Sequence, residues 1–265
     1  MWKYDPKKIY HMPVFFGGTE FVPGMTSNVY DNVTINMTLA CEARKLKEYI
    51  PEEFELMSPS VILTFCQLRA VEFMAGGGYN LIQIGVPVRY EGKENKLDGL
   101  FPLIIWENNA IPILGGREES GQPKVFADIQ DLHSYENRVF TNASYEGNKF
   151  LELEMKDMVP ISQSKLDKMN EESKQLNIFG YRCIPKVGEP GLELRQPILY
   201  PQQAYADYGW SGKGVVDLYK LTAEQCPPYY HVVDQLKELP LKEPEQVIMT
   251  QGNSKMMPFA GKVLS

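Results

Sequence analysis

The sequence predicts a mainly β fold of the α+β type, in which antiparallel strands close into a barrel and a few helices lie around it. Three observations support this prediction. Apolar residues alternate with polar ones over several segments, clusters of turn-forming residues separate these segments, and helical periodicity is confined to three short stretches. A barrel is favoured over an open sheet because closure leaves no unpaired strand edges.

The first expected strand shows the pattern most clearly. Every second residue in it is apolar, and the residues between are Asn32, Thr34, Asn36 and Thr38. This period of two is typical of a strand with one covered face. In chain order, the expected strands cover residues 32–39, 82–90, 100–106, 110–114, 138–145, 149–155, 178–184 and 214–221.

Turn signals predict how these strands are connected. Residues 91–96 and 146–148 are rich in glycine, asparagine and charged residues, so the strands on either side of each are expected to form hairpins. Residues 107–109 are expected to turn the chain into the strand over 110–114. The two glycines at 115–116 are expected to end that strand.

Three helices are expected between the strands. The first covers Cys41–Ile50 and stops at Pro51, which cannot continue a helix. The second covers Ser162–Leu176 and is largely polar, and the third covers Pro228–Leu236. No repeat and no long linker divides the chain, so residues 1–265 are predicted to form a single domain.

Composition excludes several function classes. The 265 residues include 27 Lys and Arg against 34 Asp and Glu, for a net charge of −7, so we expect no nucleic-acid partner. No apolar run approaches the roughly 20 residues that cross a bilayer, and the first residues do not resemble a secretory signal. The sequence therefore predicts a cytoplasmic protein without a membrane partner.

The motifs of cofactor and metal sites are missing or incomplete. Gly116 and Gly121 have the spacing of a phosphate-binding loop, but Gln122-Pro123 stands where lysine and a hydroxyl residue are required. The three histidines are isolated from one another, and the four cysteines are far apart, so we expect no metal and free, buried thiols. No cofactor is predicted.

One lysine has a setting that suggests chemistry. Lys124 lies between Pro123 and the apolar residues 125–127, after a loop rich in glycine and ionisable groups. Burial would penalise the ammonium form and favour a neutral amine, which can attack a carbonyl carbon. The alternative is a lysine at a strand edge whose amine reaches water, as most lysines do.

The residues around this lysine also form a recognisable motif. Gly116-Arg117-Glu118 is followed, after four residues, by Pro123-Lys124, which matches the G-R-E-x-x-x-x-P-K signature of the acetoacetate decarboxylase family. Three further segments are similar to elements of that family, namely residues 46–54, 210–212 and 239–243. Over most of its length the sequence therefore resembles this family.

The resemblance implies a fold and a mechanism. The family fold is a cone-shaped antiparallel β-barrel with peripheral helices, assembled into a large homo-oligomer. Acetoacetate decarboxylase is itself a known example of an activated lysine nucleophile. By resemblance, Lys124 is expected to form a Schiff base with a small keto acid, and the iminium would accept the electrons released when carbon dioxide leaves. This chemistry needs no metal or organic cofactor.

The resemblance also suggests roles for neighbouring residues. Glu118, with Glu119 as a second candidate, is expected to transfer protons or orient the imine. Arg117 either binds a substrate carboxylate or forms an ion pair with Glu118. Gln122 either donates a hydrogen bond to a substrate oxygen or faces water.

Several positions depart from the family pattern. The best-known members have a second lysine where this chain has Val125, and an arginine near the position of Asn32. Where those members carry carboxylates, this chain has Thr64, Cys66, Gln67, Tyr79 and Gln83. Tyr79 and Gln83 are accordingly candidate substrate-binding residues. A site with fewer charges is less suited to expel carbon dioxide by repulsion, and some relatives with altered pockets are aldolase-dehydratases that act on pyruvate and an aldehyde.

Three functional hypotheses follow. The first is a lyase that decarboxylates a 3-oxo acid through Lys124, and the second is an aldolase-dehydratase or hydratase that uses the same lysine. The third, from another class, is a non-catalytic protein that binds a small carbonyl ligand. Replacing Lys124 with alanine is expected to abolish either reaction and to leave folding nearly intact. The preferred keto acid and the number of subunits stay open.

Overall fold

The structure is a computed structural model that describes residues 2–92 and 96–265. Strands predominate. They are β1 (Lys8–Ile9), β2 (Thr19–Glu20), β3 (Ser27–Ala40), β4 (Phe54–Leu56), β5 (Ser60–Val71), β6 (Tyr79–Glu91), β7 (Lys96–Glu107), β8 (Lys124–Phe126), β9 (Asp128–Ile129), β10 (His133–Tyr135), β11 (Arg138–Tyr145), β12 (Asn148–Pro160), β13 (Leu176–Pro185), β14 (Leu192–Leu218), β15 (Pro244–Met256) and β16 (Lys262–Val263). The α-helices are α1 (Ala43–Leu46), α2 (Ala110–Glu118), α3 (Gln163–Glu172) and α4 (Tyr230–Glu238), and the 3-10 helices are η1 (Val14–Phe16), η2 (Lys47–Tyr49), η3 (Glu72–Met74) and η4 (Pro258–Ala260).

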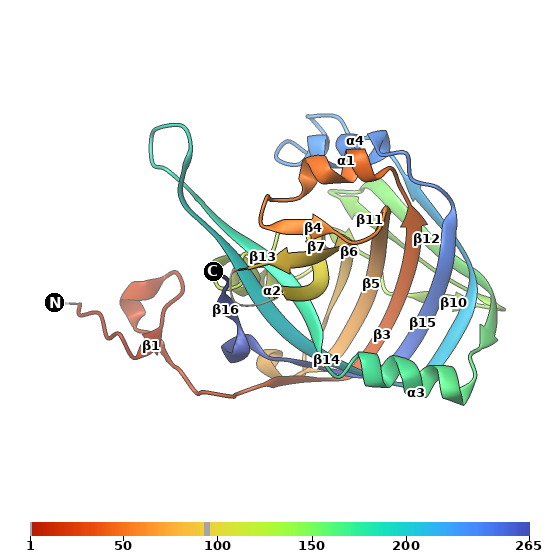
Figure 1. The fold of residues 1–265 in the computed structure, drawn as a ribbon, viewed down its shortest axis with the longest axis horizontal. Coiled ribbons are helices and arrows are strands. Elements are labelled where there is room, and N and C mark those ends of the chain that lie inside the picture. Colours follow the sequence, from red (N-terminus) through yellow and green to blue (C-terminus); the bar gives the residue numbers. More distant parts are fainter. Residues whose placement is uncertain (1, 93–95) are drawn as a thin grey trace.

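Seven strands form a closed ring. The order is β14, β13, β7, β6, β5, β3 and β15, and β15 pairs back onto β14. Figure 1 shows β5, β3 and β15 curving side by side along one wall. The predicted fold class, a barrel of mainly antiparallel strands with few helices, is confirmed. One pairing in the ring is parallel, because β13 meets β7 through Ile178 and Leu100.

The two faces of the ring strands have different roles. On β3, Ile35, Met37 and Leu39 are buried in the main hydrophobic cluster, together with side chains from β11, β12 and α4. A Cβ on Gly214 of β14 would lie within 2.7–3.1 Å of the side chains of Val247 and Met37, so this half of β14 packs closely against that same face. The hydrophobic core therefore covers one face of the sheet, and the other face is left to line a cavity.

The segment expected to be a strand over residues 110–114 is helix α2 instead, and the prediction was wrong. Asn109 begins the helix, because its side chain accepts a hydrogen bond from the backbone nitrogen of Ile111 at 3.0 Å. Pro112 lies in the first turn, where a helix needs no backbone N–H donor. A short apolar run cannot distinguish a strand from a helix by periodicity, which explains the error.

The predicted hairpins are present. Strands β6 and β7 are paired antiparallel, from Leu81 opposite Glu107 to Glu91 opposite Lys96. Residues 93–95 of the predicted turn lie outside the described residues. Strands β11 and β12 form the second hairpin. Strands β5 and β15 were missed, since neither has a clean alternation of apolar and polar residues.

The first two predicted helices are shorter in the structure, and the third keeps its length of nine residues but begins two residues later. The first consists of α1 followed by η2, and the third is α4. Ser162 caps α3 by accepting from the backbone nitrogen of Lys165, but the helix ends at Glu172 and Leu176 already belongs to β13. The segment predicted as a strand over 214–221 is the end of the 27-residue strand β14, which stops at Leu218.

The cysteines depart in part from the prediction. All four are free, and Cys41 and Cys226 are buried, but Cys183 is exposed and Cys66 is partly exposed. Among the described residues, no helix has the length and apolar character required to span a membrane.

Candidate active site

Lys124 is held between the ring and a helix. It begins β8, which pairs in parallel with β7 so that Lys124 lies beside Ile105. Its backbone nitrogen donates to the carbonyl of Gln122 at 2.8 Å, and its carbonyl accepts from Arg117 at 2.9 Å. These contacts fix the backbone, and the side chain, 14% exposed, lines the large cavity.

Helix α2 packs closely against the side chain of Lys124. A Cβ on Gly116 would lie 2.6–2.9 Å from Cδ, Cε and Nζ of Lys124, so only glycine allows this approach. The Nζ atom also donates to the carbonyl of Pro112 at 3.1 Å. The glycine of the sequence motif therefore makes room for the amine.

A buried carboxyl group contacts the amine. Glu107, the last residue of β7, is 0% exposed, and its Oε1 lies 2.8 Å from Nζ of Lys124. Its Oε2 is buried without a hydrogen-bond partner in the part of the chain that the structure describes. Burial raises the pKa of Glu107, and the neighbouring charge of Lys124 opposes that rise. Amine and carboxyl are within reach for proton transfer.

Sequence reasoning missed Glu107. It predicted a turn at residues 107–109, whereas β7 continues through Glu107. The available signal was an acidic residue directly after the apolar run that ends at Trp106. The carboxyl group that contacts the amine of Lys124 is therefore that of Glu107 rather than that of Glu118.

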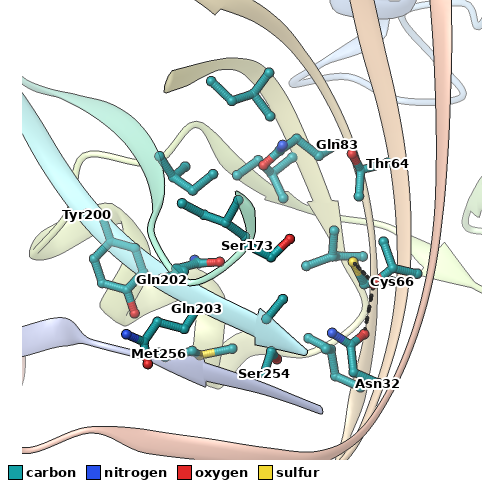
Figure 2. A pocket seen from close by; sticks show the side chains of 18 of the residues that line it. Asn32, Thr64, Cys66, Gln83, Ser173, Tyr200, Gln202, Gln203, Ser254 and Met256 are labelled. Carbon is teal, nitrogen blue, oxygen red and sulfur yellow. Dashed lines mark hydrogen bonds between the residues drawn. The ribbon is translucent and has the colours of Figure 1, made fainter. Parts of the chain in front are cut away.

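The cavity on the inner face of the ring has a volume of about 1560 Å³. Figure 2 shows uncharged polar side chains on its walls, among them Thr64, Gln83, Gln202 and Ser254, together with apolar side chains such as Met256. Asn32, Thr64, Cys66, Tyr79 and Gln83, five of the positions that depart from the family pattern, all line it. Gln67 does not, and its side chain accepts a hydrogen bond from the backbone of Leu132.

Burial raises the pKa of two side chains that line the cavity, Tyr79 and Cys66. Burial, with a smaller contribution from Glu107, raises the pKa of Tyr79 well above its usual value, so this phenol is a hydrogen-bond donor. Burial also raises the pKa of the Cys66 thiol to about 11, and its Sγ lies 3.4 Å from Oγ1 of Thr34. The thiol is therefore a poor nucleophile at neutral pH.

The remaining predicted residues are placed as follows. Glu118 lines the cavity, whereas Arg117 is exposed, does not line it and forms no ion pair with Glu118 among the described residues. Gln122 is buried on the cavity wall, where its Nε2 donates to the carbonyl of Phe179 at 3.3 Å and its Oε1 is unpaired within the described chain. Glu119 lies 2.6 Å from His11.

Among residues 2–92 and 96–265, no group of three His, Cys, Asp or Glu side chains could hold a metal ion. Around Lys124 the structure brings together an amine, an adjacent buried carboxyl group, the carboxyl group of Glu118 on the cavity wall and neutral hydrogen-bonding groups. An amine paired in this way can add to a carbonyl carbon.

Comparison with known proteins gives a consistent family. The family model described as acetoacetate decarboxylase matches residues 11–251. A search of curated proteins finds no sequence match.

Solved structures with the same fold include three instructive ones. Acetoacetate decarboxylase from Legionella pneumophila is 20% identical, with a TM-score of 0.75 over 94% of this chain and 92% of that one. An acetoacetate decarboxylase-like enzyme from Sphingomonas wittichii RW1 is 12% identical, with a TM-score of 0.67 over 90% and 93%. The enduracididine biosynthesis enzyme MppR complexed with pyruvate is 13% identical, with a TM-score of 0.70 over 97% and 98%.

Proposed function

This chain belongs to the acetoacetate decarboxylase family, and on that premise we propose that it is a lyase in which Lys124 forms a Schiff base with a carbonyl substrate. The observation that carries the proposal is the amine of Lys124 on the cavity wall, 2.8 Å from the buried carboxyl group of Glu107. A surface lysine paired with an exposed acid would offer neither a chamber for the substrate nor a local proton acceptor.

Glu107 supports the first step as a proton carrier. It takes a proton from the ammonium, and the neutral amine adds to the carbonyl carbon. The carbonyl oxygen then leaves as water with one nitrogen proton and the proton held on Glu107, so the iminium forms and Glu107 is again a carboxylate. The raised pKa of Glu107 favours the protonated form that this step requires.

The first candidate reaction is decarboxylation of a 3-oxo acid. The bond to the carboxylate carbon breaks, its electron pair moves to the iminium nitrogen, and carbon dioxide leaves. An acid on the cavity wall, for which Glu118 is our candidate, then protonates the enamine carbon, and water hydrolyses the imine. Gln122, Tyr79 and Gln83 are the groups that would orient the substrate by hydrogen bonds. Arg117 acts indirectly in this proposal, because it holds the backbone carbonyl of Lys124.

The second candidate is an aldolase-dehydratase reaction through the same iminium. It is favoured by the uncharged side chains of Thr64, Cys66 and Gln83 on the cavity wall, which cannot expel carbon dioxide by charge repulsion. The MppR structure of the same fold contains pyruvate. In this reaction the enamine of pyruvate attacks an aldehyde, and water is then eliminated.

Borohydride trapping tests the proposal. The protein is incubated with acetoacetate or pyruvate and reduced, and the adduct is located by peptide mass spectrometry. We expect added mass on the peptide that contains Lys124, retained in Lys168→Met, a lysine of α3 that also lines the cavity, and lost in Lys124→Met. Release of carbon dioxide from acetoacetate, against product formation from pyruvate and an aldehyde, separates the two reactions. No adduct with any keto acid would favour a non-catalytic binding protein.

We also propose that the protein is a cytoplasmic homo-oligomer. Figure 1 shows the N-terminal segment extending away from the ring, and its large apolar side chains are exposed, Phe16 by 92%. Exposed apolar clusters of this kind commonly mark protein interfaces. The free cysteines suit a reducing compartment.

A further inference from the structure

The carboxyl group of Glu107 has a single polar contact. Within the described residues, the amine of Lys124 is the one polar group that touches it, at 2.8 Å, and its second oxygen has no partner. Glu107 is also the last residue of β7, where the pairing with β6 ends opposite Leu81. Proton transfer requires that acid and amine stay within hydrogen-bond reach. The position of the carboxyl group therefore depends on the backbone around residue 107.

A buried asparagine on the neighbouring strand fixes that backbone. Asn80, the second residue of β6, is 0% exposed. Its backbone nitrogen donates to Oδ1 of Asn108 at 2.7 Å, and its carbonyl accepts from the backbone nitrogen of Asn108 at 3.2 Å. Asn108 directly follows Glu107. The two asparagines thus hold the end of β7 against β6 one residue past the acid.

The side chain of Asn80 joins the same point to two further segments. Its Nδ2 donates to the carbonyl of Ile129 on β9 at 3.1 Å and to Oδ1 of Asp131 at 2.9 Å. Its Oδ1 accepts from Nη1 of Arg69 on β5 at 3.0 Å. Two acceptors and a cation face the amide, so its orientation is fixed and both of its ends are satisfied. We call Asn80, Asn108, Arg69 and Asp131 the amide clamp.

The amide clamp also holds the chain that carries the nucleophile. Lys124 begins β8, and just after that strand the backbone nitrogen of Ala127 donates to the carbonyl of Glu107 at 3.0 Å. Two residues further, the carbonyl of Ile129 accepts from the side chains of both Asn80 and Asn108. Glu107 is thereby held by β6 on one side and by the chain that follows Lys124 on the other. Loss of the clamp would loosen both attachments together.

Asn80 itself is not placed to contact a substrate. Tyr79 and Leu81, its neighbours on β6, line the cavity, whereas Asn80 does not, because successive residues of a strand face opposite sides. Resting on the proposed Schiff-base function, we propose that Asn80 is a positioning residue. It keeps the carboxyl group of Glu107 within reach of the Lys124 amine, and the amide clamp in this way sets the rate at which the Schiff base forms.

A double-mutant cycle separates this role from a general effect on folding. The rate of borohydride-trapped adduct formation with saturating acetoacetate or pyruvate is measured for wild type, Asn80→Ala, Glu107→Gln and the double variant, each shown to be folded by urea unfolding. Asn80→Ala should lower the rate about tenfold or more, since a misplacement of about 1 Å can cost about 100-fold. With Glu107→Gln already present, the same change should lower it by no more than about twofold. Should Asn80→Ala fail to fold, the partly buried Asn108→Ala takes its place in the cycle.

Asn148→Ala is the matched control. The Asn148 side chain donates to the carbonyls of Tyr145 and Glu146 at 3.2 and 3.4 Å and accepts from Gln225 at 3.2 Å, but it belongs to the hairpin of β11 and β12 and does not line the cavity. This variant should leave the trapping rate unchanged. An unchanged rate in Asn80→Ala, a loss of the same size with and without Glu107→Gln, or an equal loss in Asn148→Ala would overturn the proposal.

The outcomes also separate this inference from the proposed function. If adducts form at Lys124 and Asn80→Ala has no effect, the Schiff-base function stands and the positioning role is wrong. If no carbonyl compound forms an adduct, the proposed function fails, and stability then decides the clamp. The coupling between Lys124 and Glu107, measured by urea unfolding of Lys124→Met, Glu107→Gln and their combination, should fall by about half or more when Asn80→Ala is added. Equal coupling with and without Asn80→Ala would overturn the role of the clamp.

Discussion

Removal of the Lys124 amine should destabilise the protein, because the buried carboxyl group of Glu107 loses its ion-pair partner. From the sequence alone, a truncated Lys124 leaves no buried charge, and folding is expected to be nearly intact. The structure changes this expectation, because Glu107 is fully buried and Lys124 provides its only ion pair among the described residues. We therefore predict that Lys124→Met, which keeps an unbranched side chain, destabilises the fold at neutral pH.

The magnitude follows from the buried pair. Loss of one partner of such a pair typically costs about 3–5 kcal/mol, because the other charge is left uncompensated. Burial already raises the pKa of Glu107 above 4.5, and without Lys124 it should rise further. Each additional unit corresponds to about 1.4 kcal/mol of unfolding free energy at pH values above the folded-state pKa.

The raised pKa of Glu107 determines whether the stability of the protein rises or falls with pH. A carboxyl group whose pKa is raised in the folded state binds more protons folded than unfolded, so stability falls as pH rises from the unfolded pKa of 4.5 towards the folded one. Lys124→Met should therefore resemble wild type near pH 4 and lose stability steadily above that. Glu107→Gln should cost less, since the Lys124 side chain is 14% exposed and keeps its hydrogen bond to Pro112.

Urea unfolding at pH 4 and pH 8 measures these differences at one fixed protein concentration. Wild type, both single variants and Lys124→Met/Glu107→Gln are compared, and the double variant should recover most of the stability lost in Lys124→Met. The reasoning is refuted if Lys124→Met loses the same free energy at both pH values, or if the two single effects simply add.

Three further predictions use internal controls. Gly116→Ala should reduce the rate of borohydride-trapped adduct formation by about tenfold or more, since a shift of the amine misplaces the attacking atom, whereas Gly115→Ala, whose Cβ would meet nothing within 4 Å, should not. Iodoacetamide at pH 8 should modify the exposed Cys183 well before Cys66, whose thiolate fraction is about one in a thousand at a pKa of about 11, and peptide mass spectrometry would show the reverse order if this is wrong. Phe16→Ser should lower the molar mass measured by light scattering if the N-terminal segment joins copies of the chain, and an unchanged mass would remove that segment from the interface.

Local signals were sufficient where neighbouring residues decide the structure. The hairpin of β11 and β12 follows from alternation on both sides of a turn, and Ser162 marks the start of α3. The alternation of apolar and polar residues failed at α2, because a short apolar run fits either a strand or a helix. In the structure, the side chain of Asn109 caps this segment as a helix.

The sequence by itself determined the mainly β fold class and, through the motif that ends in Pro123-Lys124, the nucleophile that we propose. Only the tertiary structure decided which acid meets the amine. Glu107 and Lys124 are 17 positions apart, and the parallel pairing of β7 with β8 brings them together. Only the closed ring of strands shows that the polar face of β3 lines a cavity. Alternation of apolar and polar residues predicts that the two faces of a strand differ, but it does not predict whether a face contacts solvent, a cavity or another element.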